Sequence, residues 1–92
     1  VVTQGSTVTD AAPVSVGVAA TLLCAADASR ESCRFYNAGT VDVYIGGAGV
    51  TTANGAIRLA PGATWIERDA APAAWYGISG SAAQSVRVQT VA

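Results

Sequence analysis

The fold is decided by the stretch NAGTVDVYIGGAGVTTANGAIRLAPGATW, residues 37–65. Hydrophobic residues alternate with polar or aromatic ones through 41–45, which is the period of a strand with one buried face. Asn54-Gly55 is a dipeptide preferred in type I′ turns, because both residues tolerate positive φ. A short strand is expected at 57–59, and Pro61-Gly62 has the sequence of a type II turn centre. The stretch therefore predicts short strands separated by tight turns.

The same pattern extends to both sides of this stretch. Turn residues separate short segments at spacings of about 8–12 residues, which is typical of sandwiches and small barrels. The segments lie too close together for helical crossovers, which excludes a parallel α/β sheet, although the Ala and Leu residues of 21–26 also suit a helical turn. We expect an all-β fold, an antiparallel β-sandwich of jelly-roll-like form with seven to eight short strands. The expected strands are residues 14–18, 21–26, 30–36, 41–45, 57–59, 64–69, 75–79 and 85–91.

The chain has 92 residues, which is enough for one domain. Residues 1–13 are rich in Thr, Ser and Gly, are weakly patterned and end at Pro13. Such a segment predicts an extended N-terminal arm that adds nothing to the core. Residues 14–92 are expected to form a single β-sandwich domain.

Charged residues make up 12% of the chain, hydrophobic residues 51%, and the formal net charge is −1. An average soluble domain is about 25% charged. A disordered chain is not expected, because low hydrophobicity and high net charge are the signature of disorder and this chain has neither. A nucleic-acid partner is not expected, because a few arginines without lysines give no cationic field for phosphates. A small chain with so little charge is expected to bury much of its surface against other protein chains.

Membrane association is not expected either. The sequence has no run of about 18 consecutive apolar residues, the length that a membrane-spanning helix needs. The most apolar window, residues 14–28, follows no basic segment, so it does not have the form of a signal peptide.

Catalytic chemistry has few candidate residues here. The chain contains neither His nor Lys, which removes the usual bases and the activated-serine chemistries. Glu67 and Asp69 share one side of an expected strand, but an exposed strand face beside Arg68 is favoured over an acid–base pair. The glycine-rich residues 46–49 lack the Lys-Ser/Thr ending and the helix of a phosphate loop. We expect no enzyme activity, no cofactor and no metal site.

Two cysteines form a candidate disulfide. If residues 22–27 and 30–36 made a hairpin with its turn at Ala28-Ser29, Cys24 would lie opposite Cys33. Directly opposed residues of an antiparallel pair come within disulfide range. The alternative is two buried free thiols that act as small apolar residues.

The aromatic residues supply candidate interface positions. Phe35 and Tyr36 are adjacent on an expected strand and point to opposite faces, so one of them is expected in the core and the other at the surface. Exposed aromatic rings either stack on sugars or anchor protein contacts, and the low charge favours protein contacts. The candidate interface aromatics are Tyr44, Trp65 and Trp75.

Three stretches of the sequence carry a family resemblance. They are NAGTVDVYIGGAGVTTANGAIRLAPGATW (37–65), AAWYGISG (73–80) and SVRVQTV (85–91). Their order of strands and turns resembles small β proteins of tailed bacteriophages and prophages, across roughly residues 14–92. Proteins of this kind occur as head decoration (cement) proteins and as small domains of fibres and other virion parts. The cysteine pair and the high Ala content depart from that pattern.

The resemblance implies a structural role in a virion. A decoration protein binds the lattice of the major capsid protein, stabilises the head, and commonly acts as a homo-oligomer, here expected as a trimer. Such a chain would be made in the bacterial host cytoplasm and would end on the capsid surface. The alternative is a small tail-fibre or baseplate module that recognises a host-surface glycan through Trp65, Trp75 or Tyr44.

Overall fold

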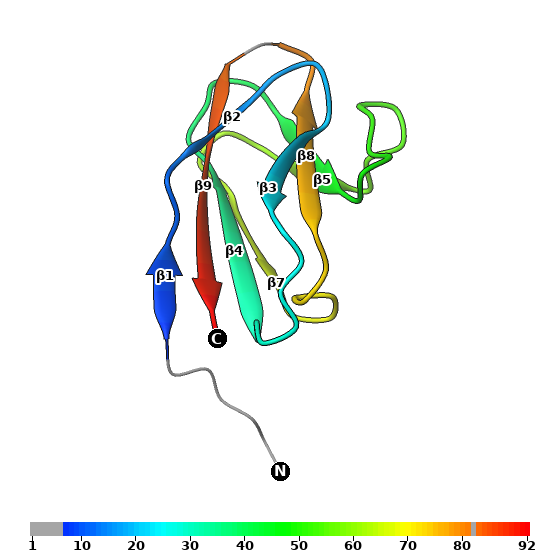
Figure 1. Ribbon diagram of the computed structural model, residues 1–92. Helices are drawn as coiled ribbons and strands as arrows, with labels where there is room; N and C mark the ends of the chain where they lie inside the picture. The colour runs from blue at the N-terminus through cyan, green and yellow to red at the C-terminus, as the bar shows by residue number, and fades with distance from the viewer. Residues whose placement is uncertain (1–6, 82) are drawn as a thin grey trace.

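The protein is a sandwich of two antiparallel β-sheets, and Figure 1 shows strands β1, β9 and β4 of one sheet side by side on the left and strands β8 and β5 of the other on the right. The computed structural model describes residues 7–81 and 83–92, and these contain no helix. The expected antiparallel β-sandwich is therefore confirmed. The strands are β1 (Val8–Asp10), β2 (Val14–Val16), β3 (Thr21–Cys24), β4 (Ser32–Asn37), β5 (Val43–Gly46), β6 (Ile57–Leu59), β7 (Thr64–Glu67), β8 (Trp75–Ser79) and β9 (Gln84–Val91).

The chain changes sheet at nearly every connection. The first sheet has the order β1-β9-β4-β7, and β2 pairs with the other half of β9. The second sheet has the order β3-β8-β5-β6. The β5–β6 pair is the hairpin between neighbouring strands in the part of the chain that the structure describes. Most neighbours in each sheet are thus far apart in the sequence.

Eight of the nine strands fall in the segments where strands are expected. The ninth, β1, lies in the stretch expected to be an extended arm, and each of its three residues is exposed. It pairs with the C-terminal half of β9, where Val8 lies opposite Val91. Residues 1–6 of the expected arm lie outside the described residues.

The core forms where the inner faces of the two sheets meet. Alternation along β4 buries Cys33 and Phe35 completely, whereas Tyr36 is 36% exposed on the outer face. The expected division between Phe35 and Tyr36 is therefore confirmed. The buried core residues are Val16, Leu23, Cys33, Phe35, Val43, Ile45, Leu59, Val86 and Val88.

Pro61-Gly62 forms the expected type II turn. The amide of Ala63 donates to the carbonyl oxygen of Ala60 at 2.9 Å, and Gly62 has a φ of 82°. Positive φ at the second central position is what this turn type requires, and glycine meets it without strain.

Asn54-Gly55 does not form the expected type I′ turn. Among the described residues positive φ occurs at Gly62 and Ala83, so neither residue of the dipeptide has it. The Gly55 amide instead donates to the carbonyl of Thr51 at 2.9 Å, and the Asn54 side chain accepts from the Thr51 amide at 2.7 Å. Gly55 lies so close to Tyr44 that an added Cβ would approach the tyrosine Cβ to 2.6 Å. Here glycine permits close packing.

The predicted hairpin of residues 22–27 and 30–36 is wrong. β3 pairs with β8 in the second sheet, and β4 pairs with β7 and β9 in the first. Residues 25–31 form an arch between the sheets, held by the buried side chain of Arg30. Its guanidinium donates to the carbonyl oxygens of Ala71 at 2.6 Å, Ala73 at 2.7 Å and Ala25 at 2.9 Å. These bonds satisfy three backbone carbonyls in loops. The predicted two-residue turn would have had no such loop to hold.

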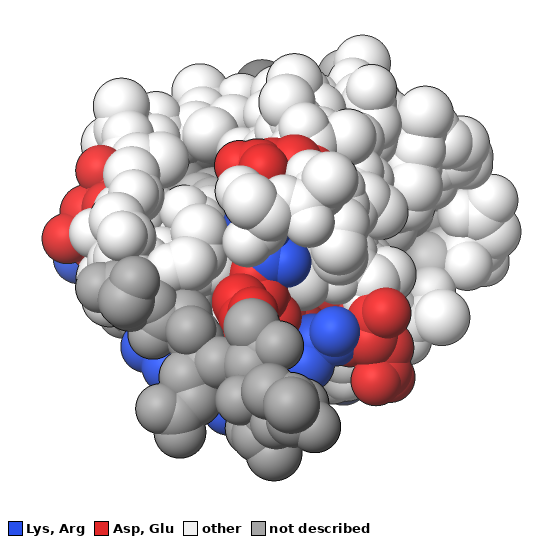
Figure 2. Space-filling view, turned by 60° about the horizontal axis from the view of Figure 1, so that its bottom comes forward, with Lys and Arg blue, Asp and Glu red and all other residues white. Residues whose placement is uncertain are grey.

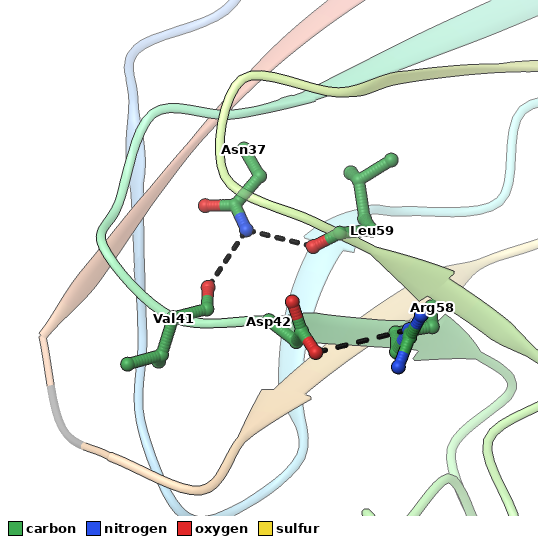
Figure 3. Close-up of polar contacts among 5 residues, drawn as sticks. All are labelled: Asn37, Val41, Asp42, Arg58 and Leu59. Atoms are coloured by element: carbon green, nitrogen blue, oxygen red, sulfur yellow. Dashed lines mark hydrogen bonds and ion pairs between the residues drawn. The ribbon is translucent and has the colours of Figure 1, made fainter.

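A buried amide joins the sheets at the opposite end (Figure 3). Asn37, at the end of β4 and 0% exposed, donates from Nδ2 to the carbonyls of Val41 and Leu59, each at 2.8 Å. Its Oδ1 accepts from the Gly39 amide at 2.8 Å. Leu59 belongs to β6, so Asn37 links the first sheet to the second.

Candidate functional site

A groove crosses the outer face of the first sheet. Its volume is ≈ 540 Å³, which falls within the range of about 300–1,000 Å³ found for ligand sites. Ala11 and Pro13, between β1 and β2, line the groove on one side, and Thr64 of β7 lines it on the other. The polar side chains that line the groove are Asp10, Arg34, Tyr36, Thr64, Arg87 and Gln89.

The sheet register places the groove side chains in two rows that run across the strands, one with Arg34 and Gln89 and the other with Tyr36 and Arg87. Arg34 and Tyr36 point outward from β4 because they alternate with the buried Cys33 and Phe35. On β9, Gln89 lies opposite Arg34 and Arg87 lies opposite Tyr36. Arg34 and Arg87 are therefore diagonal neighbours on one face, at a typical separation of about 7–8 Å.

These side chains contact one another within each row. The guanidinium of Arg87 lies over the Tyr36 ring, 5.6 Å from its centroid. Arg34 Nη1 donates to Gln89 Oε1 at 2.8 Å, and Gln89 Nε2 donates to Asp10 Oδ1 at 2.8 Å. Gln89 thus separates the carboxylate of Asp10 from the guanidinium of Arg34.

Neither groove arginine has an acidic partner. Across residues 7–81 and 83–92 the one ion pair is Arg58–Asp42, at 3.7 Å on the second sheet (Figure 3). The Arg34 and Arg87 guanidiniums keep free donors, which is the arrangement that carboxylates and phosphates recognise.

The outer face of the second sheet has a different character. Leu22 on β3 is 44% exposed, and Tyr76 on β8 lies directly beside it. Tyr44 on β5 shares this face and is half-buried. The charges on this face, Arg58 and Asp42, pair with each other at the β6 edge. Across β3, β8 and β5 the face is apolar and tyrosine-bearing.

The three candidate interface aromatics lie in three different places. Tyr44 is on the outer face of the second sheet. Trp65 is on the edge strand β7 and is 39% exposed, with Nε1 donating to Glu67 Oε1 at 3.0 Å. Trp75 points inward, 6.1 Å from the Phe35 ring, with Nε1 donating to the carbonyl of Ala70 at 3.0 Å. The three rings form no common surface.

Glu67 is not on an exposed strand face, which corrects the sequence-based interpretation. It is 7% exposed, and its Oε2 accepts from the Ala70 amide at 2.9 Å. Glu67 lies opposite the buried Cys33 in the β4–β7 register, so this carboxylate faces inward beside Trp65, whereas Asp69 in the following loop is exposed. Glu67 therefore caps a loop, and the two carboxylates have different environments.

The two cysteines meet across the sandwich. Cys24 ends β3 and packs against the core, and Cys33 is fully buried on β4 of the other sheet. Both are free thiols in the structure, so their bridging stays a prediction. A hydrogen bond with Cys33 lowers the pKa of Cys24 to about 6, with a further contribution from the charge of Arg30. The same hydrogen bond, together with burial, raises the pKa of Cys33.

Charge gathers at one end of the molecule. Figure 2 shows red and blue side chains close together at the end where the loops 25–31 and 68–74 lie, with a wide uncharged surface beyond them. Both signs are mixed there, so this end has no field of a single sign. The described residues contain no group of three or more His, Cys, Asp or Glu side chains able to hold a metal ion. They also contain no helix long and apolar enough to cross a membrane.

The groove residues were not predicted from the sequence. A signal existed in Arg34-x-Tyr36 and Arg87-x-Gln89, since each pair occupies one face of a strand. What the sequence does not show is that β4 and β9 are neighbours, because their pairing joins segments far apart in the chain.

Comparison with families of known proteins, with curated protein sequences and with solved structures gave no match for this chain. The resemblance to phage virion proteins stays a prediction.

Proposed function

We propose that the chain is a structural virion protein of the head-decoration type, which binds the lattice of the major capsid protein and stabilises the head. The observation that carries the proposal is the outer face of the second sheet. It presents Leu22, Tyr44 and Tyr76 with no unpaired charge. Tyrosine-bearing surfaces depleted in charge are characteristic of interface centres.

The exposed edge strand β7 supports the same proposal. On the edge strand β7, Trp65 is 39% and Ile66 45% exposed. Exposed apolar edge strands are normally protected because they pair readily with other chains. A homo-oligomer, with a trimer favoured, covers such an edge, and burial then contributes about 25 cal/mol per Å² of apolar area before association costs.

Two measurements test this function. Light scattering of the pure protein gives its oligomeric state, and quantitative mass spectrometry of purified virus particles gives its copy number relative to the major capsid protein. The proposal expects an oligomer and a copy number that scales with the capsid lattice. A monomer that is absent from particles, or present in only a few copies, contradicts it.

A host-glycan module of a tail fibre or baseplate is the second candidate function. It is favoured by the half-exposed Trp65, which lies beside a hollow of ≈ 200 Å³ lined also by Ile66, Glu67, Arg68 and Asp69. An indole face next to the exposed Asp69 carboxylate and Arg68 guanidinium suits a sugar ring. Saturable quenching of tryptophan fluorescence by cell-wall sugars, lost in Trp65→Ala, would favour this function. No binding across a glycan panel would count against it.

A further inference from the structure

We propose that the groove on the outer face of the first sheet binds the carboxylates of an acidic segment of a partner protein, through Arg34 and Arg87. The inference rests on the proposed function in one respect, since it takes the partner to be a protein. It assigns a second surface, opposite the apolar face of the second sheet, and gives that surface its own chemistry.

The groove contains two guanidiniums that neighbouring side chains hold in place and that form no ion pair with a described carboxylate. The Tyr36 ring supports Arg87 at 5.6 Å, and the side-chain oxygen of Gln89 supports Arg34 at 2.8 Å. Each contact restricts a long side chain before any ligand arrives, so less conformational entropy is lost on binding. Each guanidinium still has donors left, because one group carries five N–H donors in a planar fork.

The groove favours carboxylates on a peptide over other anions. Two cations in a chain of net charge −1 are too few for a nucleic acid, whose affinity depends on many phosphate contacts. A sugar needs a free aromatic face, and Arg87 occupies the face of Tyr36. The diagonal spacing of Arg34 and Arg87 matches two side chains of one extended segment, which repeat at about 6.5–7 Å for alternate residues.

Asp10 places a negative charge at one rim of the groove. Its carboxylate accepts from Gln89 at one rim, and it is the single acidic residue among those that line the groove. An acidic segment is therefore attracted toward Arg34 and Arg87 and repelled at the Asp10 rim. Removal of this carboxylate should strengthen binding of acidic peptides.

The test uses the full chain and a blocked hexapeptide of glutamate as the probe. The matched peptide of glutamine, inorganic phosphate and an oligomer of galacturonic acid serve as comparison ligands. Binding is measured by calorimetry, and two-dimensional NMR of the unaltered protein follows the Tyr36 ring and the arginine Nε–H signals. The proposal expects the glutamate peptide to bind most tightly, to shift these signals, and to weaken as salt rises.

Variants assign the binding to the groove. Arg34→Gln and Arg87→Gln should each weaken the glutamate peptide by about tenfold, whereas Asp10→Asn should strengthen it. Arg58→Gln is the matched control on the other sheet and should leave the affinity unchanged. Equal affinity for the glutamate and glutamine peptides, tighter binding of phosphate or the uronate, or unshifted Tyr36 and arginine signals would overturn the inference. If the chain is abundant in particles but does not bind the glutamate peptide, this inference fails and the proposed function stands. If the chain binds the peptide but is absent from particles, the proposed function fails and the groove assignment stands.

Discussion

The side-chain amide of Asn37 on β4 donates to the carbonyl oxygen of Leu59 on β6 at 2.8 Å, and so connects the two sheets through a residue that water does not reach. The same Nδ2 satisfies Val41 at 2.8 Å. One buried side chain therefore donates to two backbone carbonyls, which adds contacts between the sheets that no strand ladder supplies.

Replacement of Asn37 should be costly. Asn37→Ala leaves the carbonyls of Val41 and Leu59 without their buried donor, and each loss costs about 1–3 kcal/mol. We expect the free energy of unfolding in urea to fall by about 2–4 kcal/mol. Asn54→Ala, in an exposed loop, is the control and should cost under about 1 kcal/mol. Equal effects of the two substitutions would show that Asn37 does not join the sheets.

Arg30 should contribute to stability through its guanidinium. Arg30→Met keeps much of the stem but removes the donors to Ala25, Ala71 and Ala73. We expect urea unfolding to show a loss of about 2–4 kcal/mol. The exposed Arg68→Met should change stability by under about 0.5 kcal/mol. If Arg30→Met proves as mild as Arg68→Met, the account of the 25–31 arch fails.

Cys24 should react as a thiolate near neutral pH. Its pKa is lowered to about 6 by the hydrogen bond with Cys33, so the reactive form is present above that pH and is lost as the pH falls through about 6. The rate of iodoacetamide labelling of the folded protein, resolved by peptide mapping, should show this midpoint. Cys33→Ala removes the hydrogen bond and should move the midpoint up toward the ordinary thiol range near about 8.5. An unchanged midpoint in that variant contradicts the assignment.

The two thiols should join under mild oxidation. Diamide accepts two electrons and two protons as the Cys24–Cys33 bond forms, and intact mass under non-reducing conditions should show the loss of two hydrogens. The bridge should stabilise the fold by roughly 2–3 kcal/mol, the amount that chain entropy gives for so short a loop. Two alkylated thiols on the denatured, diamide-treated chain would show that the pair does not bridge.

A charge on the apolar face should break assembly while leaving the fold intact. Leu22 is 44% exposed, so Leu22→Asp should change the stability of the monomer by under about 1 kcal/mol. The buried charge should nevertheless dissociate the oligomer, as measured by light scattering. Val18→Asp is the matched control, because Val18 is 67% exposed and lies in the loop before β3, not on a strand of this sheet. Dissociation by both variants, or by neither, would disprove the interface.

Local pattern was enough to predict the strands and part of the core. Period-two alternation predicted that Phe35 and Tyr36 divide between core and surface, and Pro61-Gly62 specified its turn through the φ that glycine allows. These features depend on a residue and its near neighbours in the sequence. The local sequence pattern is therefore enough to predict them.

Pairing between distant segments could not be predicted in the same way. The hairpin predicted around Cys24 and Cys33 was wrong because β3 pairs with β8, a partner chosen by burial of the whole sheet face. The groove was missed for the same reason, since Arg34 and Arg87 become neighbours only when β9 lies beside β4. The turn expected at Asn54-Gly55 was wrong, and the structure has in its place a loop hydrogen-bonded to Thr51, with Gly55 packed closely on Tyr44.

A structure of the assembled virus particle would show whether the outer face of the second sheet binds the capsid. The quantity to measure is the solvent accessibility of Leu22, Tyr44 and Tyr76 on each bound copy. We expect neighbouring protein chains to cover this face and to bury about 800 Å² or more per partner, as stable interfaces do. Copies whose second sheet faces open solvent, or particles without the chain, would contradict it.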